Sequence, residues 1–339
     1  MIIERLDKGP VLGDGGAIFE LERRGYVSAG PFTPEVVLEH PDVVRQMQID
    51  FARAGAEVLQ AVTYYAHEDK LRVRGLADKV DELNASAVRI AREAAAENDC
   101  LVAGNLSNTW VYDPEDPSSH AETRRQFDQQ ITAQASAGVD FFIAETFGYL
   151  GEALLAIEAI HAAGKVAMIT MGFKYNDKTI EQIALEEAFA RLEQAGAEIV
   201  GINCFRDPER TLPLAARVRR TVFCHVATQP VAYRCTDENP YFQAQRHAGR
   251  VAFPLEMDPL TLSRVEMAEY AAAALTLGVN FIGSCCGAGP HHVRAMAEAL
   301  GRTPPNGRYS PHLEQHPIIG SDDFRREKDR RIIDEQRGG

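Results

Sequence analysis

Short apolar runs alternate along the chain with longer stretches in which apolar residues recur every three or four positions. Each run is too short for a helix, and several are rich in β-branched or aromatic residues, which is typical of buried parallel strands. Most end in Gly, Ser, Thr or Cys, so we expect functional loops after them. The eight runs lie at 11–16, 57–65, 101–107, 140–146, 166–172, 198–204, 223–230 and 280–286.

The longer stretches have the periodicity of amphipathic helices. Most of them lead into a segment such as "AGAEV" or "AGVDF", in which Gly can end the helix in a left-handed conformation. They lie at 42–54, 81–97, 121–137, 152–163, 181–195, 208–219, 262–277 and 291–300. Eight strand–helix units in order predict an α/β fold, a (β/α)8 or TIM barrel, with an open doubly wound sheet as the alternative. The turn "GDGG" lacks the G-x-G-x-x-G spacing of dinucleotide-binding folds.

Two irregular regions complete the predicted organisation. The segment 234–257 is long for a connection, and in a barrel we expect it to lie over the active-site face. We expect the barrel to occupy residues 1–302. The polar remainder, 303–339, is predicted to be a C-terminal tail or an oligomerisation arm of a homo-oligomer.

Composition restricts the class of protein and its partners. The net charge of −13 and the pI near 5.3 argue against nucleic acid or an anionic membrane as the main partner. No apolar run has membrane-spanning length, and the first residues lack the pattern of a secretory leader, so a cytoplasmic protein is expected. The six cysteines do not form a disulfide framework in a chain of this length.

Three cysteines fall at predicted strand ends. Cys204 closes the sixth run, and Cys285 and Cys286 close the eighth. Because strand ends converge on one face of a barrel, three thiols could meet around one ion, and zinc with three protein ligands keeps an open position. Adjacent cysteines need a bend to ligate together, which Gly283 and Gly287 can supply. Gly201 is expected to help in the same way before Cys204.

Core packing is the alternative for every thiol, because free cysteine is among the most buried residue types. It is the interpretation we adopt for Cys100, Cys224 and Cys235, which have no second thiol at strand-end spacing. For Cys204, Cys285 and Cys286, the residues alone leave both interpretations open.

Longer motifs resemble a known family. "GINC" at 201–204, followed by "GSCCG" at 283–287, resembles the zinc-binding signature of the homocysteine S-methyltransferases. The stretch beginning "GDGGAIFELERRG" and the motif "TYYAHEDKL" are closest to the betaine–homocysteine methyltransferases of that family. The resemblance extends over roughly residues 3–302. It implies a TIM-barrel enzyme that uses Zn²⁺ to transfer a methyl group from an onium donor to homocysteine, giving methionine.

The resemblance also implies roles for individual residues. Cys204, Cys285 and Cys286 would be the zinc ligands, and the open position would take the homocysteine sulfur. Asp14, Gly15 and Glu145 would hold the amino acid end of homocysteine, with Asp14 and Glu145 as the catalytic pair. Tyr65 would line the donor site, and Asn203 would orient the neighbouring ligand. A simple turn is the alternative for Asp14, whereas a carboxylate such as Glu145, at the end of an apolar run, needs a partner or a ligand.

Two departures from the family pattern concern the donor pocket. The betaine enzymes have tryptophan where this chain has Phe32, and tyrosine where it has Thr146. Loss of ring area weakens a cage for a quaternary cation, unless Phe147, Tyr149 or Trp110 rebuilds it. The expected donor is therefore glycine betaine or a related betaine. The alternative is a sulfonium compound such as S-methylmethionine or a dimethylsulfonio acid.

Two other classes of function remain. A non-catalytic barrel with a structural zinc would close the site with a fourth ligand, for instance His225 or Asp207. A metal-dependent hydrolase would use histidine and carboxylate ligands in place of three thiols. His291 and His292 follow Pro290 at a predicted helix start and are interpreted as capping or surface residues.

Overall fold

Eight parallel strands form one sheet in the computed structural model, which describes all residues except 97, 317–319, 322–326 and 337–339. The sheet order is β1-β10-β7-β6-β5-β4-β3-β2, so strands β2 to β7 pair in chain order and β10 lies between β7 and β1. The strands are β1 (Val11–Leu12), β2 (Val58–Gln60), β3 (Leu101–Ser107), β4 (Phe141–Phe147), β5 (Ala167–Met171), β6 (Ile199–Asn203), β7 (His225–Gln229) and β10 (Phe281–Ile282). All eight predicted runs contain one.

The two outer strands of this sheet meet and nearly close it into a barrel. Glu57 N, just before β2, donates to Leu12 O in β1 (2.8 Å). The Glu57 carboxylate accepts a hydrogen bond from Leu12 N (2.9 Å). A single parallel sheet whose two outer strands meet in this way confirms the TIM barrel over the doubly wound alternative.

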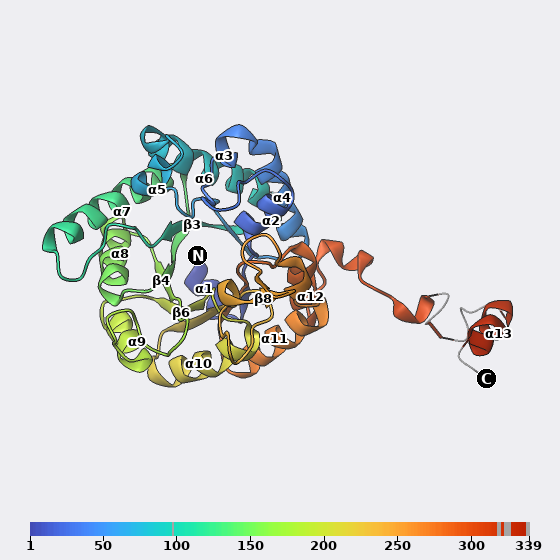
Figure 1. The fold of residues 1–339 in the computed structure, drawn as a ribbon. Coiled ribbons are helices and arrows are strands. Elements are labelled where there is room, and N and C mark those ends of the chain that lie inside the picture. The colour runs from blue at the N-terminus through green and yellow to red at the C-terminus, as the bar shows by residue number, and fades with distance from the viewer. Residues whose placement is uncertain (97, 317–319, 322–326, 337–339) are drawn as a thin grey trace. The chain divides into compact units, whose positions relative to one another are not determined.

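Helices surround the barrel (Figure 1). The eight predicted helices correspond to α4 (Pro41–Arg53), α6 (Val80–Ala96), α7 (Pro117–Ala137), α8 (Leu150–Ala162), α9 (Leu185–Gln194), α10 (Pro208–Thr221), α11 (Arg264–Thr276) and α12 (Pro290–Ala299). Short helices α2 (Ala17–Arg23), α3 (Val36–Glu39) and α5 (Glu68–Arg72) lie in the first two loops. The expected glycines follow four of the long helices with positive φ, at Gly55, Gly138, Gly196 and Gly278.

One helix begins later than its pattern predicted. Helix α9 was expected from residue 181 but starts at Leu185. The Glu181 carboxylate accepts hydrogen bonds from Leu150 N (2.8 Å) and Gly151 N (2.9 Å), at the start of α8. Glu181 therefore caps a neighbouring helix, and 172–184 remains a loop above the sheet.

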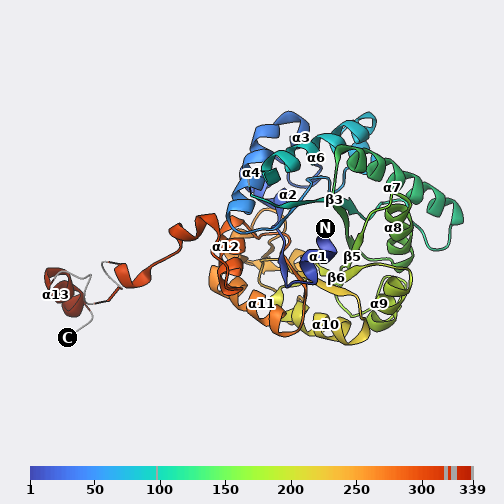
Figure 2. The ribbon, with the colours of Figure 1, turned by 180° about the vertical axis from the view of Figure 1, so that it is seen from behind.

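Helix α1 (Ile2–Leu6) closes the end of the barrel where the strands begin, and Figure 2 shows it across the centre. Ile2 and Leu6 pack against inward-facing strand residues, including Phe141, Met168 and Phe281, in one apolar cluster. The opposite end, at the carboxyl ends of the strands, is therefore where a ligand can enter.

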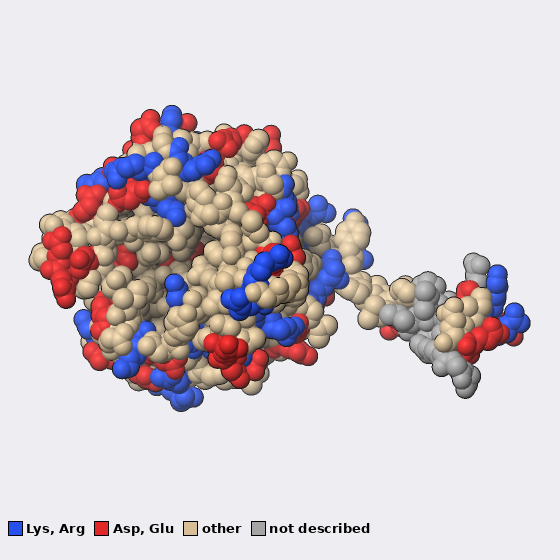
Figure 3. Space-filling view, viewed as in Figure 1, with Lys and Arg blue, Asp and Glu red and all other residues tan. Residues whose placement is uncertain are grey.

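The segment 234–257 lies over that entrance, as predicted. It holds the short antiparallel pair β8 (Arg246–His247) and β9 (Arg250–Val251), and Phe242 and Phe253 contribute to the cavity below. Figure 1 shows β8 over the barrel mouth, and Figure 3 shows this face hollowed near its centre.

Residues 1–304 and 305–339 form separate compact units. The second contains two short 3-10 helices and α13 (Glu327–Gln336). The role of this segment as an arm, the boundary after residue 302 and the homo-oligomeric state stay predictions. Within the described residues, no helix is both long and apolar enough to span a membrane.

Gly201 in β6 should be essential for folding, because a Cβ there would lie 2.1 Å from Ala227 O in β7. Backbone on a neighbouring strand cannot move aside cheaply, so Gly201→Ala should lower the free energy of unfolding by at least about 2 kcal/mol. The measurement is the unfolding midpoint in heat or urea. Gly9→Ala is the matched control, since no atom lies within 4 Å of its Cβ position. Equal midpoints for the two variants would contradict the argument.

Candidate metal centre and active site

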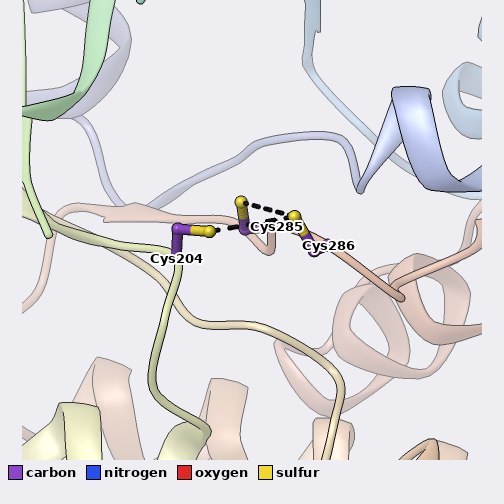
Figure 4. Close-up of side chains that lie close together, drawn as sticks. All are labelled: Cys204, Cys285 and Cys286. Atoms are coloured by element: carbon purple, nitrogen blue, oxygen red, sulfur yellow. Dashed lines mark hydrogen bonds between the residues drawn. The ribbon is translucent and has the colours of Figure 1, made fainter. Parts of the chain in front are cut away.

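The three cysteines predicted as ligands meet at the mouth of the barrel (Figure 4). Cys286 Sγ lies 3.8 Å from Cys204 Sγ and 3.8 Å from Cys285 Sγ. All three sulfurs lie within 4.8 Å of one another. Two sulfurs bound at about 2.3 Å to a tetrahedral zinc ion are separated by about 3.8 Å. The cluster therefore has the spacing of a metal-binding thiol set.

The chain after β7 holds both cysteine segments in place. Cys204 N donates to Gln229 O (2.8 Å), and Cys285 N donates to Pro230 O (2.8 Å). Ala232 N in turn donates to Cys286 O (2.9 Å). Because β7 lies between β6 and β10 in the sheet, one segment sets the distance between the two ligand-bearing loops.

The bends that aim the sulfurs differ in part from expectation. Gly287 has φ +86°, as predicted for the bend after Cys286. Gly201 and Gly283 do not adopt positive φ; they are glycines because neighbouring atoms approach closely. After β6, the residues with a left-handed backbone are Cys204 itself (φ 57°) and Phe205 (φ 50°). Left-handed non-glycine residues are strained and cluster at functional sites.

The three thiols shift one another's pKa values. Hydrogen bonding with Cys285 and Cys286 lowers the pKa of the Cys204 thiol well below its usual value. The contact with Cys204, together with burial, raises the pKa values of Cys285 and Cys286. One thiolate is stabilised by its neighbours, and a cation is needed to stabilise all three.

No histidine or carboxylate joins this cluster in the described part of the chain. Asp207 caps α10 and pairs with Arg210 (3.1 Å), while His225 pairs with Asp7 (3.2 Å) at the start of β7. His292 accepts from Gly289 N (3.1 Å) at the start of α12, consistent with the expected capping role. A fourth protein ligand from the predicted pair is therefore ruled out.

Glu145 lies in the same cavity, in a ring of amides. Its Oε1 accepts from Gln60 Nε2 (2.5 Å) and Asn105 Nδ2 (2.6 Å), and its Oε2 accepts from Asn203 Nδ2 (2.8 Å). Burial raises the pKa of Glu145 to about 8, the nearby Cys285 adds to the rise, and the amide donors oppose it. A ligand cation would restore the ionised form.

Asp14 is the second buried carboxyl group of the cavity. It accepts a hydrogen bond from Gln60 N (2.8 Å), and burial raises its pKa to about 8. Asp14 O also accepts from Ser284 N (3.3 Å), which joins the first strand to the cysteine turn. A Cβ on Gly15 would lie 2.5 Å from Ala288 O, so only glycine permits this approach. The turn interpretation does not account for a buried Asp14 side chain that faces a cavity.

Asn203 contacts the carboxylate side of the site. Besides Glu145, it donates to Thr146 Oγ1 (2.7 Å) and accepts from Thr146 N (2.9 Å). Thr146 has φ 66°, and these bonds hold that conformation. Asn203 therefore orients Glu145 and Thr146, whereas the prediction had it orient the sulfur of Cys204.

The aromatic lining differs in part from expectation. Tyr64 and Tyr65 both line the cavity; strand β2 ends at Gln60, and Tyr65 adopts a left-handed φ of 63°. Phe32 lines the cavity and stacks on Phe19 (5.0 Å between centroids). Trp110 lines it as well.

Two rings expected as replacements do not reach the cavity. Phe147 is fully buried against Phe127, and Tyr149 packs on Tyr112. Of the three rings named as alternative replacements, Trp110 lines the cavity, whereas Phe147 points out of the barrel toward α7. The loops supply rings that the pattern did not indicate, namely Tyr175, Phe205, Phe242 and Phe253.

These groups share one cavity of about 690 Å³. It brings together Asp14, Gly15, Phe32, Tyr65, Glu145, Thr146, Cys204, Cys285 and Cys286. Sequence reasoning missed Gln60 and Asn105, which hold Glu145, and Lys70. A polar amide inside an apolar run, as in "EVLQ" and "LVAGNLS", was the available signal for the first two.

The comparison with known families decides the assignment. The model of the homocysteine S-methyltransferase family matches residues 11–300. The chain belongs to this family. It is 40% identical to betaine–homocysteine S-methyltransferase 1 of Bos taurus over 94% of this chain and 79% of that protein. It is 36% identical to the S-methylmethionine–homocysteine S-methyltransferase of Pongo abelii, over 94% and 86% respectively.

A solved structure supports the fold. The homocysteine methyltransferase MmuM of Escherichia coli, in its metallated form, superposes with a TM-score of 0.69. It covers 86% of this chain and 96% of its own, at 21% identity. At this identity the likeness bears on the barrel alone.

Proposed function

We propose that this methyltransferase moves a methyl group from an onium donor, glycine betaine or a related betaine, to homocysteine, giving methionine and the demethylated donor, with Zn²⁺ as cofactor. Membership of the family establishes the class of enzyme. One observation carries the rest, the meeting of three sulfurs at metal spacing with a buried carboxyl pair in one cavity.

The donor set fits zinc. Three sulfur atoms and no side-chain nitrogen or oxygen from the described residues form the cluster, and thiolates favour soft or borderline ions. Three protein ligands leave one coordination position for substrate. When bound, zinc deprotonates a coordinated thiol and so supplies a thiolate nucleophile at neutral pH.

Glu145 and Asp14 suit the ammonium group of homocysteine. Burial raises the pKa values of both carboxyl groups, and a ligand ammonium beside them would favour their ionised forms. Gln60 contacts both of them, so the pair acts as one anionic site. Holding the amino end there turns the thiol of the substrate toward the cysteines.

Methyl transfer needs no proton relay from the protein once the acceptor sulfur is ionised. The new S–C bond forms as the N–C bond of the donor breaks, and the bonding electrons stay on nitrogen. Opposite charges are neutralised, so a closed cavity that positions both reactants lowers the barrier. The rings of Tyr65, Phe32 and Phe205 line the same cavity as the sulfurs and suit a quaternary cation.

A sulfonium donor is the second candidate. Phe32 and Thr146 offer less ring area than the tryptophan and tyrosine of the betaine enzymes, and a sulfonium centre has one methyl group fewer to enclose. A relative named for S-methylmethionine is 36% identical to this chain. A purely structural zinc is not supported, because His225 and Asp207 are engaged elsewhere.

Zinc content should depend on the cysteine cluster. The purified protein should contain about one zinc per chain by elemental analysis, and Cys285→Ala or Cys286→Ala should lose most of it. Cys100→Ala is the control, because its half-buried thiol lies at the start of β3, donates to Ala56 O (3.1 Å) and should not bind metal. Full stoichiometry in both cluster variants would remove the metal assignment.

Glu145→Gln should raise the KM for homocysteine by roughly tenfold or more, because a charge-assisted contact with the ammonium is lost while volume is kept. Initial rates at varied homocysteine measure it. The control is Glu152→Gln, a buried glutamate outside the cavity that accepts two hydrogen bonds from Thr109. That variant should leave the KM within about twofold. An unchanged KM in Glu145→Gln would refute the role of the carboxylate.

Methionine formation with a panel of donors tests the reaction itself. The protein loaded with zinc should form methionine from homocysteine with glycine betaine, and the Cys286→Ala variant should not. Turnover with dimethylsulfonioacetate or S-methylmethionine but not with glycine betaine would favour the sulfonium alternative. No methionine from any onium donor would reject the proposal.

A further inference from the structure

A buried lysine lies in the cavity wall without an anionic partner. Lys70, in α5, is 7% exposed, and its ammonium group faces the cavity that holds the cysteines. Its Nζ lies 4.1 Å from the ring centroid of Trp110 and 4.4 Å from that of Tyr65. Throughout the described residues, Nζ makes no hydrogen bond or ion pair.

The acidic groups nearest to it in sequence are already engaged. Glu68 pairs with Arg72 and Arg125 (2.6 Å each). Asp69 pairs with Arg72 (2.5 Å) and accepts from Gln126 (2.8 Å). On the neighbouring segment, Glu35 pairs with Arg74 (3.3 Å) and accepts from Thr33 (2.6 Å). These three carboxylates are thus paired with other side chains.

Two aromatic faces offset only part of the cost of burying a cation. Desolvation lowers the pKa of Lys70, and no neighbouring negative charge opposes it. A charge in this position gains most from an anion delivered by a ligand, since both partners are then removed from water together.

The position of Tyr65 links Lys70 to the reacting centre. Tyr65, Cys204 and Cys286 line one cavity. The Tyr65 ring also faces Lys70. A small ligand lying along Tyr65 therefore has the cysteines near one end and the ammonium of Lys70 near the other.

We propose that Lys70 binds the carboxylate of the methyl donor and so selects zwitterionic donors, whose onium centre and carboxylate are a few bonds apart. This inference rests on the proposed methyl transfer. Like charges repel, so Lys70 keeps the onium end away from itself and turns the methyl groups toward the acceptor sulfur. Lys70 acts as a specificity-determining residue, and onium compounds with a neutral end are poor donors.

The test compares matched donors in the zinc-loaded enzyme: glycine betaine with its amide, and dimethylsulfonioacetate with its amide. The wild type should prefer the acid by at least roughly tenfold in kcat/KM, the factor for one charge-assisted hydrogen bond. Lys70→Met keeps the apolar stem and removes the charge. The ratio of kcat/KM for the acid donor to that for its amide should therefore fall to about one, because activity with the acid donor is lost. Lys70→Arg should retain most of the preference, and the KM for homocysteine should stay within about twofold in both variants.

Lys174→Met is the matched comparison, because Lys174 also places its ammonium over a cavity ring, at 4.9 Å from the centroid of Phe205. It is exposed, and its replacement should change the acid-to-amide ratio by less than about threefold. An equal loss of the ratio in Lys174→Met, or an equal fall for acid and amide in Lys70→Met, would overturn the role of Lys70 and leave the methyltransferase proposal standing. No turnover by the wild type with any onium donor would reject both.

A binding measurement covers the case in which Lys70→Met does not fold. Trp110 is the single tryptophan of the chain, and its ring contacts Lys70. Titration of the wild type should therefore change the tryptophan emission, with glycine betaine binding at least roughly tenfold more tightly than its amide. Equal affinities for acid and amide would contradict the inference without any variant.

Discussion

The segment that follows β7 is the constraint on which the site depends. Its carbonyl groups at Gln229 and Pro230 accept from the amides of Cys204 and Cys285, and Ala232 donates back to Cys286. Thiol side chains alone would not hold two loops about 80 residues apart at 3.8 Å sulfur spacing. The close approach of Gly201 to Ala227 brings β6 near enough to β7 for this pattern to form. The spacing of the sulfur atoms is thus set by the backbone through the register of the barrel strands.

Amide side chains from three strands hold the Glu145 carboxylate in place. Gln60, Asn105 and Asn203 come from β2, β3 and β6, and each donates to this one carboxylate. Burial and three donors act in opposite directions on its pKa, so its charge responds to what enters the cavity. Asn203 also fixes Thr146 and is followed by Cys204. The part of the site around Glu145 and the part around the cysteines are therefore coupled through adjacent residues of one strand end.

The sequence predicted the strand and helix pattern well because the period of apolar residues and the glycines after helices are local signals. The three sulfurs were also predictable, since strand ends converge in a barrel. Three features were not. The bend at Cys204 lies on the cysteine itself, and the expected glycines are there for close packing. The orientation of Phe147 toward α7 was not predictable, because no local signal shows which side chains at a strand end point out of the barrel. Glu181 lies outside α9 and caps α8, so this tertiary contact overrides the helical periodicity of the sequence.

The charged side chains of the cavity lie at two ends, one negative and one positive. This arrangement bears on how the cavity distinguishes its two proposed substrates. Asp14 and Glu145 offer negative charge beside the cysteines, and they suit the ammonium of an amino acid. Lys70 offers positive charge over Tyr65 and Trp110, and it suits a carboxylate. Homocysteine and a betaine are both zwitterions, so the two ends would sort them by where the positive and negative groups lie relative to the reacting atom. Under the proposed function, this polarity places the onium carbon and the acceptor sulfur between the two charged ends. The smaller ring area at Phe32 and Thr146 is then tolerable, because the charges orient the donor and so do part of what a full aromatic cage would do.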